Sequence, residues 1–253
     1  MASNTPNLNL YMKDPVTEGN DFFDIKTMMN DNWRAIDTFA GSTKGSLEKA
    51  TKFVVTSDMF GATGNNTDQT QAIQNALNYL ESVGGGKLVL GAGTFLLSLA
   101  KSVHSKACIL IPAGVTIEGS GMGVTILKRL ESERNQDGVL LVNKDYDTRG
   151  EYKAAGNITL RNFTITDGDV TATPRTYGDL IALGHADNVL IERVGSLNHD
   201  QHFVDVCGSR NITIRDCMCN NLQDTYGSAT IQIDRAKSLA FGACCWMIQI
   251  QAM

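Results

Sequence analysis

Two aspartates occupy outward positions, offset by two residues, in the neighbouring repeated runs VDVC and IQID. Because successive residues of a strand point to opposite faces, Asp205 and Asp234 face the same way in adjacent strands, two residues apart along the chain direction. Strands about 4.8 Å apart and a two-residue step of about 6.6 Å give a backbone separation of roughly 8 Å. Carboxyl groups about 6.5–9.5 Å apart act as acid and base in inverting glycosidases. We therefore predict Asp205 and Asp234 as catalytic residues.

Further polar residues fall near the same face or its bordering turns, and we predict that they bind sugar hydroxyls or a charged substituent. These residues are Asp200, His202, Tyr226, Gln232 and Arg235. Two alternatives stay open: the aspartates are ordinary solvated side chains, or the face binds carbohydrate without turnover. A calcium-assisted lyase needs acidic ligands and a basic side chain, and it is less favoured because Arg235 alone fits near the cluster.

The outward positions follow from an internal repeat. Aligning Asn188, Asn211 and Ser238 brings apolar pairs into register on both sides. Upstream, the pairs are Ile181/Leu183, Val204/Val206 and Ile231/Ile233, and downstream they are Val189/Ile191, Ile212/Ile214 and Leu239/Phe241. Short strands repeated at about 23 residues or more are typical of a solenoid, in which a corner asparagine can hydrogen-bond turn backbone from coil to coil. The sequence predicts an all-β fold, a right-handed parallel β-helix.

Residues 53–97 predict the start of this solenoid. The order is strand, turn at 61–66, helix near residues 67–82, a stop at Gly84–Gly86, and two strands. Thr67 or Asp68 is expected to cap the helix, whose apolar face carries Ala72, Ile73, Ala76, Leu77 and Leu80. This α-helix is expected to cap the β-helix.

An amphipathic helix is also predicted within residues 24–41, from a cap at Asp24 to an end at Gly41. Its apolar positions are Ile25, Met28, Met29, Trp33, Ile36 and Phe39. A single helix cannot bury such a stripe by itself, so residues 1–50 are expected to form an attachment segment that docks on a partner, and residues 51–253 the β-helix.

Composition and charge argue against several classes of function. The net charge is −5 and Lys and Arg are not clustered, so nucleic-acid binding is not expected. The chain has no apolar run of membrane-spanning length and no secretory signal, which predicts synthesis in a host cytoplasm. The spacing of the six cysteines, such as Cys217/Cys219 and Cys244/Cys245, does not fit a zinc site. We expect reduced, buried thiols, and neither metal nor cofactor.

The stretch from residue 53 to 98 resembles the opening of the pectate-lyase-like β-helix superfamily. The matching positions are Asp68, Thr70, Ala72, Ile73, Gln74, Ala76, Gly84 to Gly86, Gly93 and Phe95. Asn65 and Asn66 depart from the pattern, where an aspartate is more usual. The resemblance implies a β-helix that acts on or binds polysaccharide.

The stretch NLNLYMKDPVTEGNDFFDIKTMMNDNWRAID resembles the start of tail-spike and pre-neck appendage proteins in phages of Gram-positive bacteria. That resemblance implies a virion protein, usually a homotrimer, which contacts phage tail or neck proteins through residues 1–50 and host wall or capsular polysaccharide through its β-helix. A hydrolase, a lyase, a non-catalytic appendage and an inactive fragment all remain open, as do the sugar, the linkage and the host. Related appendages carry an acidic residue in the run that here reads Ser228 to Asp234, and this chain lacks it.

After Gly242-Ala243 the repeat pattern stops without a capping element. A solenoid needs a cap or a partner at its last coil, so the sequence suggests a β-helix truncated at its C-terminus, with a naturally short chain as the alternative.

Overall fold

The computed structural model describes residues 3–4, 8, 10–12, 29–51, 53–102, 106–133, 136–147, 152–168, 178–199, 201–222, 230–234 and 248–251. The chain divides into two compact units, Met1–Lys52 and Phe53–Met253. Neither described helix combines the length and hydrophobicity needed to cross a lipid bilayer.

The first unit holds a small antiparallel pair and one long helix. Strands β1 (Ser3–Asn4) and β2 (Tyr11–Met12) pair with each other, and α1 spans Asp31–Thr51. The expected end at Gly41 is wrong, because the helix continues for ten more residues. An internal glycine costs about 1 kcal/mol relative to alanine without breaking a helix. The expected cap, Asp24, lies outside the described residues.

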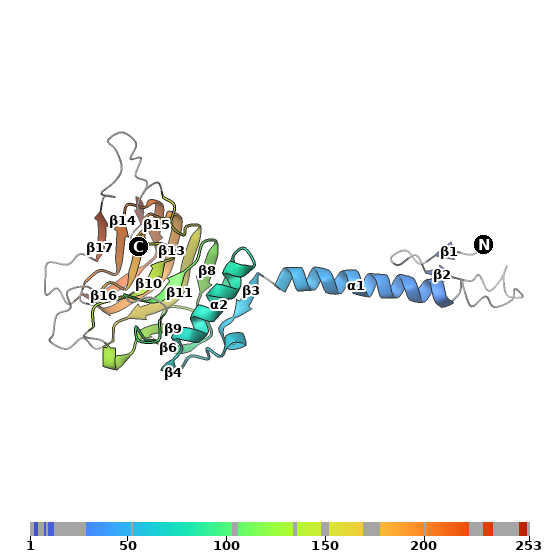
Figure 1. The fold of residues 1–253 in the computed structure, drawn as a ribbon, viewed down its shortest axis with the longest axis horizontal. Coiled ribbons are helices and arrows are strands. Elements are labelled where there is room, and N and C mark those ends of the chain that lie inside the picture. Colours follow the sequence, from blue (N-terminus) through green and yellow to red (C-terminus); the bar gives the residue numbers. More distant parts are fainter. Residues whose placement is uncertain are drawn as a thin grey trace, which may run out of the picture. The chain divides into compact units, whose positions relative to one another are not determined.

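The second unit is a parallel β-helix, as the repeat predicted (Figure 1). Its first two coils contain β3 (Val54–Thr56), the 3₁₀ turn η2 (Ser57–Phe60), β4 (Asn65–Asp68), α2 (Thr70–Ser82), β5 (Gly86–Val89) and β6 (Gly93–Leu97). Strand β5 stacks on β3, and β6 stacks on β4. Asn65 and Asn66 were expected to belong to the turn at residues 61–66. They instead begin strand β4, which pairs with β6.

The following coils add strands to the same faces. They are β7 (Ala107–Ile111), β8 (Val115–Glu118), β9 (Thr125–Arg129), β10 (Val139–Asn143), β11 (Ile158–Thr166), β12 (Ile181–Gly184), β13 (Asp187–His199), β14 (Val204–Cys207), β15 (Arg210–Arg215), β16 (Met218–Leu222), β17 (Ile231–Asp234) and β18 (Ile248–Gln251), with the 3₁₀ turn η3 (Glu131–Glu133) after β9.

Three parallel ladders run along the solenoid. One is the five-stranded sheet β17-β14-β12-β10-β7, and a second follows β18-β15-β13-β11-β8-β5-β3. The third joins β4, β6 and β9 to the distal part of β11, whose neighbour β13 pairs in turn with β16. Strands β11 and β13 therefore serve two ladders, and each changes direction at a residue with positive φ, Asn162 or Arg193.

The helix α2 covers the first coils, close to β5 and β7 (Figure 1). Asp68 accepts hydrogen bonds from the backbone N–H and the hydroxyl of Thr70 at its start. The predicted apolar face is buried at Ile73, Ala76, Leu77 and Leu80. Gln74 bonds both the N–H and the carbonyl of Leu110 at 2.9 and 3.0 Å, so α2 supplies partners to backbone groups of β7.

The interior consists of aliphatic residues stacked from coil to coil. Ile181 pairs with Val204, which pairs with Ile231, and Val189 pairs with Ile212. Each of these two-strand registers is the one expected from the repeat. At the far end, however, Ile248 rather than Leu239 pairs with Ile212, because the run IQIQ carries the same alternation of apolar and polar residues. Leu239 and Phe241 lie outside the described residues.

Asparagines form the corner before the second ladder. Asn157, Asn188 and Asn211 all adopt the left-handed conformation, with φ of 53°, 61° and 55°, which asparagine tolerates better than most residues. The Asn188 amide donates to Oδ1 of Asn157 at 2.8 Å, and the Asn211 amide donates to Asp187 at 2.7 Å. The corner bonds therefore join side chain to side chain, not side chain to backbone as expected, and they link successive coils.

The Asn188 corner can be tested by two substitutions. Asn188→Ala should lower the free energy of unfolding by about 1–2 kcal/mol, because alanine is strained at this φ and the inter-coil hydrogen bond is lost. Asn188→Gly loses the same bond but accepts the conformation, so it should cost less. Urea unfolding of both variants measures the difference. A glycine variant less stable than the alanine variant would contradict the role given to the backbone conformation.

Candidate functional site

The outer face of the five-stranded sheet carries an in-register row of residues. Leu110 pairs with Val142, Val142 with Ala182, Ala182 with Asp205, and Asp205 with Gln232. The next outward row contains Gly184, Cys207 and Asp234. Asp205 and Asp234 are thus diagonal neighbours on adjacent strands, in the register that the repeat predicted.

The two carboxylates are closer than the sequence suggested. One oxygen of Asp205, one of Asp234 and the sulfur of Cys207 lie within 4.8 Å of one another. This is the closest approach of single atoms, and it favours the separation of about 5–5.5 Å between the carboxyl groups of retaining enzymes over the about 6.5–9.5 Å of inverting ones. The backbone register sets where each side chain begins, but diagonal neighbours can lean toward each other, and here they do.

Asp205 sits in an environment that opposes its charge. It is 5% exposed, and among the described residues its buried Oδ1 atom has no hydrogen-bond partner. The pKa of Asp205 is raised to about 6, mainly by burial and to a smaller extent by the nearby negative charge of Asp179. At neutral to mildly acidic pH, Asp205 can therefore hold and release a proton.

Asp234 has a contrasting environment. Its side chain is exposed, and Gln232 donates a hydrogen bond to its Oδ2 atom at 2.8 Å. A pair of carboxyl groups in which one is buried and one is solvated is the arrangement that separates acid from nucleophile or base in glycoside hydrolysis.

His202 is held by an acidic partner one coil away. Its Nδ1 atom lies 2.7 Å from Oδ1 of Asp179, and its backbone N–H donates to the same oxygen at 3.2 Å. The hydrogen bond to Asp179 raises the pKa of His202, and the charges of Asp205 and Asp234 act in the same direction. The pairing with Asp179 therefore extends upward the pH range over which the His202 imidazole carries a positive charge.

Cys207 and Tyr146 complete the cluster. The Cys207 thiol donates to Oδ2 of Asp205 at 3.4 Å, and the Tyr146 hydroxyl donates to the Cys207 sulfur at 3.5 Å. Burial raises the pKa of Cys207 to about 11. A thiol must lose its proton to bind a metal, and the raised pKa of Cys207 opposes this, so Asp205, Cys207 and Asp234 form a poor cation site although their ligand atoms lie within 4.8 Å of one another.

The predicted binding residues have different outcomes. The structure brings His202 and Gln232 to the Asp205–Asp234 pair, whereas Asp200, Tyr226 and Arg235 lie outside the described residues. The free cysteines among the described residues are buried at Cys108 and half-buried at the other three positions.

Three residues of the cluster were not predicted as site residues. Cys207 occupies the next outward position after Asp205, and it was expected only to be a reduced, buried thiol. Asp179 stands 23 residues before His202, which is one repeat, so the same alignment could have revealed it. Tyr146 lies in an insertion without repeat pattern, and no sequence signal places it.

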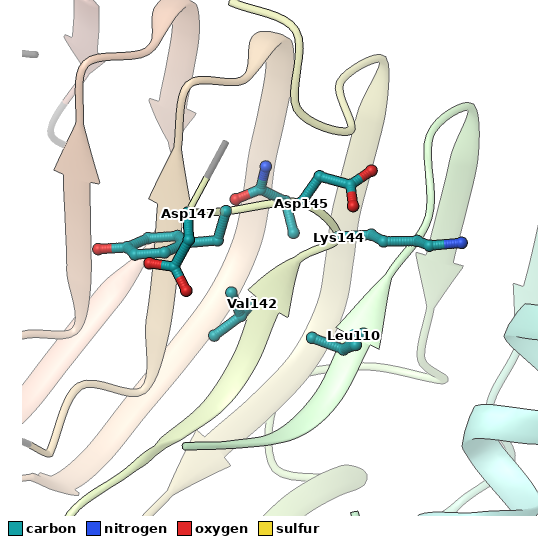
Figure 2. Close-up of a pocket in the computed structure, with 7 residues that line it drawn as sticks. Leu110, Val142, Lys144, Asp145 and Asp147 are labelled. Atoms are coloured by element: carbon teal, nitrogen blue, oxygen red, sulfur yellow. The ribbon is translucent and has the colours of Figure 1, made fainter. Parts of the chain in front are cut away.

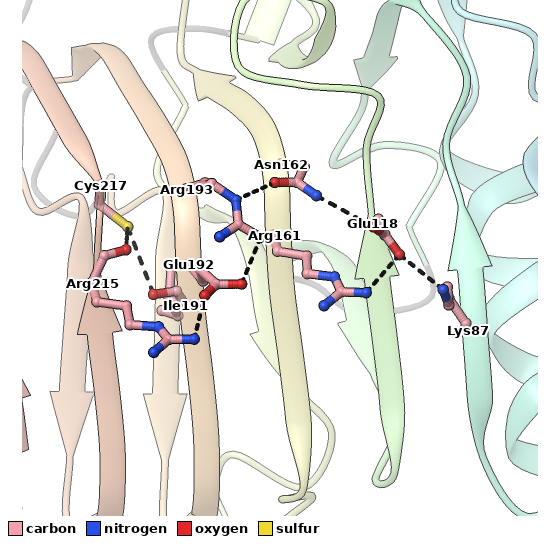
Figure 3. Close-up of polar contacts among 9 residues, drawn as sticks. All are labelled: Lys87, Glu118, Arg161, Asn162, Ile191, Glu192, Arg193, Arg215 and Cys217. Carbon is pink, nitrogen blue, oxygen red and sulfur yellow. Dashed lines mark hydrogen bonds and ion pairs between the residues drawn. The ribbon is translucent and has the colours of Figure 1, made fainter.

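The outer face of the second ladder contrasts with this cluster (Figure 3). Lys87 and Arg161 pair with Glu118 at 3.0 and 2.9 Å, and Arg193 and Arg215 both pair with Glu192. The Arg161 hydrogen bond holds the pKa of Glu118 below its usual range. The acidic groups of this ladder are neutralised by neighbours across the strands, which is a structural arrangement and leaves the five-stranded sheet as the candidate site.

Comparisons with known proteins agree with this fold. No protein-family model matches the chain. The mannuronan C5-epimerase AlgE5 of Azotobacter vinelandii is 31% identical over 170 residues, which cover 64% of this chain and 16% of that protein. Alginate lyase 7 of the same bacterium is 28% identical over 165 residues, covering 64% and 19%. The chain therefore spans less than a fifth of the length of these two relatives.

Solved structures show the same architecture. The A-module of the A. vinelandii mannuronan C-5 epimerase AlgE6 aligns with a TM-score of 0.52 and 24% identity, covering 64% of this chain and 42% of the module. The tailspike protein of Escherichia coli bacteriophage HK620, solved with a pentasaccharide, aligns with a TM-score of 0.56 and 18% identity. The alignment covers 73% of this chain and 34% of the tailspike chain. The Streptococcus pneumoniae surface adhesin PfbA also aligns with a TM-score of 0.56 and 18% identity, covering 70% of this chain and 42% of the adhesin chain. The expected resemblance to tail-spike and pectate-lyase-like β-helices is confirmed at the level of the fold.

Proposed function

We propose that this chain binds a cell-surface polysaccharide along the outer face of its five-stranded sheet and cleaves it at the Asp205–Asp234 pair. The similar proteins support the substrate class, because their names describe a mannuronan epimerase, an alginate lyase and a tailspike solved with an oligosaccharide. The N-terminal resemblance supports the setting, a phage or prophage tail appendage that recognises host wall or capsular glycan.

The observation that carries the proposal is the contrast between the two carboxyl groups. Asp205 is buried, has a raised pKa and is suited to protonate the leaving glycosidic oxygen. Asp234 is exposed and within 4.8 Å, so its carboxylate can approach the sugar from the sheet surface. The short separation favours a retaining reaction, in which Asp234 attacks the anomeric carbon and Asp205 then activates water.

The neighbouring groups suit this division of roles. The Cys207 thiol donates to Oδ2 of Asp205 and fixes the orientation of its carboxyl group. His202, held by Asp179, supplies a donor and a positive charge near both carboxyl groups. Gln232 orients Asp234 through its amide. The second candidate function is adhesion without turnover, and it is favoured by the absence of an acidic residue at Ala229 in the run where related appendages carry one.

An exposed apolar row that runs from Met29 into α1 supports self-association of the chain, and we propose that the assembly is a homotrimer. Met29, Trp33 and Ile36 follow one another at spacings of four and three residues, the pattern of a coiled-coil seam. The Trp33 side chain is 61% exposed, and Phe39 beside the seam is 54% exposed. An exposed apolar row of this kind is stabilised when copies of the helix pack against each other or against a tail protein.

Cleavage is tested by Asp205→Asn and Asp234→Asn, assayed for new reducing ends on a panel of wall and capsular polysaccharides that includes mannuronan and alginate. Each variant should retain glycan binding and lose at least about 100-fold in rate, the usual size of an acid or base contribution. Asp58→Asn, an exposed aspartate outside the site, is the matched control and should cleave normally.

The products separate the candidate reactions. Retained anomeric configuration in the first-formed product supports the short carboxyl separation, and inversion would contradict it. Unsaturated sugar ends would indicate a lyase instead. Binding by the wild-type chain with no bond cleavage in any polysaccharide would leave adhesion as the function.

Assembly is tested by light scattering on the purified chain, which should have about three times the 27.4 kDa of one protomer. The double substitution Trp33→Glu with Ile36→Glu should reduce the mass, because charges in a coiled-coil seam oppose packing. Arg34→Ala, at an exposed charged position outside the apolar row, should not. A wild-type monomer at micromolar concentration would contradict the trimer.

A further inference from the structure

A cavity lies on the outer face of the five-stranded sheet, beside the acidic cluster. It has a volume of about 370 Å³ and is lined by Leu110 and residues 142–147. Figure 2 shows Leu110 and Val142 on neighbouring strands, below the turn that carries Lys144, Asp145 and Asp147. Its volume is within the about 300–1,000 Å³ usual for small-molecule sites.

The floor of the cavity is apolar although it belongs to an outward face. Val142 packs in a small hydrophobic cluster with Ala107, Val139 and Ala182, separate from the main core. Leu110 packs against the same cluster and stays half-buried. An apolar floor of this size favours a ligand with a methyl group or an apolar ring face.

The rim of the cavity is negatively charged. Asp145 and Asp147 are exposed, whereas the Lys144 ammonium lies 2.6 Å from Oε1 of Glu81 and is neutralised by it. Lys144 is the sole cation among the described lining residues. A sugar that carries a carboxylate would be repelled by this rim, while hydroxyl and amide N–H groups would find acceptors there.

Tyr146 connects the cavity to the cleavage pair. It lines the cavity and its hydroxyl bonds Cys207, which bonds Asp205. A Cβ atom at Gly184 would lie 2.6 Å from Cδ2 of Tyr146, so the absence of a side chain at Gly184 lets the ring lie against the sheet. Val142 and Asp205 occupy the same outward row two ladder steps apart, which is about 9.6 Å. One glycan lying across the strands would reach both.

We propose that this cavity is a sugar subsite that selects a neutral sugar with a methyl substituent, an N-acetyl or a 6-deoxy sugar, and rejects uronic acids. This subsite rests on the proposed function, and it defines the chemical class of one sugar unit of the polysaccharide. Asp145 and Asp147 accept hydrogen bonds from the hydroxyl or amide groups of that unit, and Leu110 and Val142 receive its methyl group.

The test is saturation-transfer NMR on the full chain with the methyl glycosides of N-acetylglucosamine, N-acetylmannosamine, rhamnose and glucuronic acid. Signal should be strongest at the acetyl or deoxy methyl protons and absent for the glucuronide. Leu110→Asp should weaken binding at least tenfold, and Val124→Asp, at an exposed valine outside the cavity, should not. Tyr146→Ala removes a side chain that lines the cavity and should also weaken binding, whereas Tyr79→Ala on α2 should not.

The results discriminate between the subsite and the proposed function. Equal binding of the glucuronide, binding unchanged by both Leu110→Asp and Tyr146→Ala, or no binding of any of these sugars would overturn the subsite. If polysaccharide is nevertheless cleaved in an Asp205-dependent manner, the proposed function stands without it. Methyl-sugar binding that persists in Asp205→Asn, with no polysaccharide cleaved by the wild type, would support the subsite and remove the cleavage.

Discussion

The parallel register between coils is the constraint on which the rest of the structure depends. It is maintained by interior stacks such as Ile181 on Val204 and by corner asparagines, where Asn188 bonds Asn157 in the preceding coil. Because a one-residue slip would turn every side chain to the other face, this register decides which residues meet outside. His202 meets Asp179, and Asp234 approaches Asp205, only because the coils are aligned in this way.

The same register gives two outer faces with opposite electrostatic character. On the second ladder, Glu118 and Glu192 are each bonded by basic side chains from neighbouring strands, so charge is neutralised and the face is stabilised. On the five-stranded sheet, Asp205 is buried with one oxygen that has no partner among the described residues. Burying a carboxyl group in this way costs free energy unless it is protonated. We infer that the chain tolerates this unfavourable burial because the proton held by Asp205 takes part in the proposed cleavage.

Sequence reasoning predicted what the repeat controls and missed what it does not. The alignment of the repeats placed Asp205, Gln232 and Asp234 on one face, and the helical pattern after Asp68 predicted α2. It overestimated the carboxyl separation, because backbone register does not set the direction of a side chain. Tyr146 and the cavity beside it come from an insertion with no repeat. Gly41 does not end α1, because a glycine ends a helix only where the chain also adopts a capping conformation.

The pKa of Asp205 is the most direct measurement of the central claim, that this face carries a buried acid beside an exposed carboxylate. The chain labelled with ¹³C at aspartate carboxyl carbons would be titrated by NMR, with Asp205→Asn identifying the resonance. We predict a midpoint of about 6 for Asp205. A midpoint near the ordinary value of about 3.9 would show that Asp205 is ionised throughout the neutral range and would contradict its role as the acid.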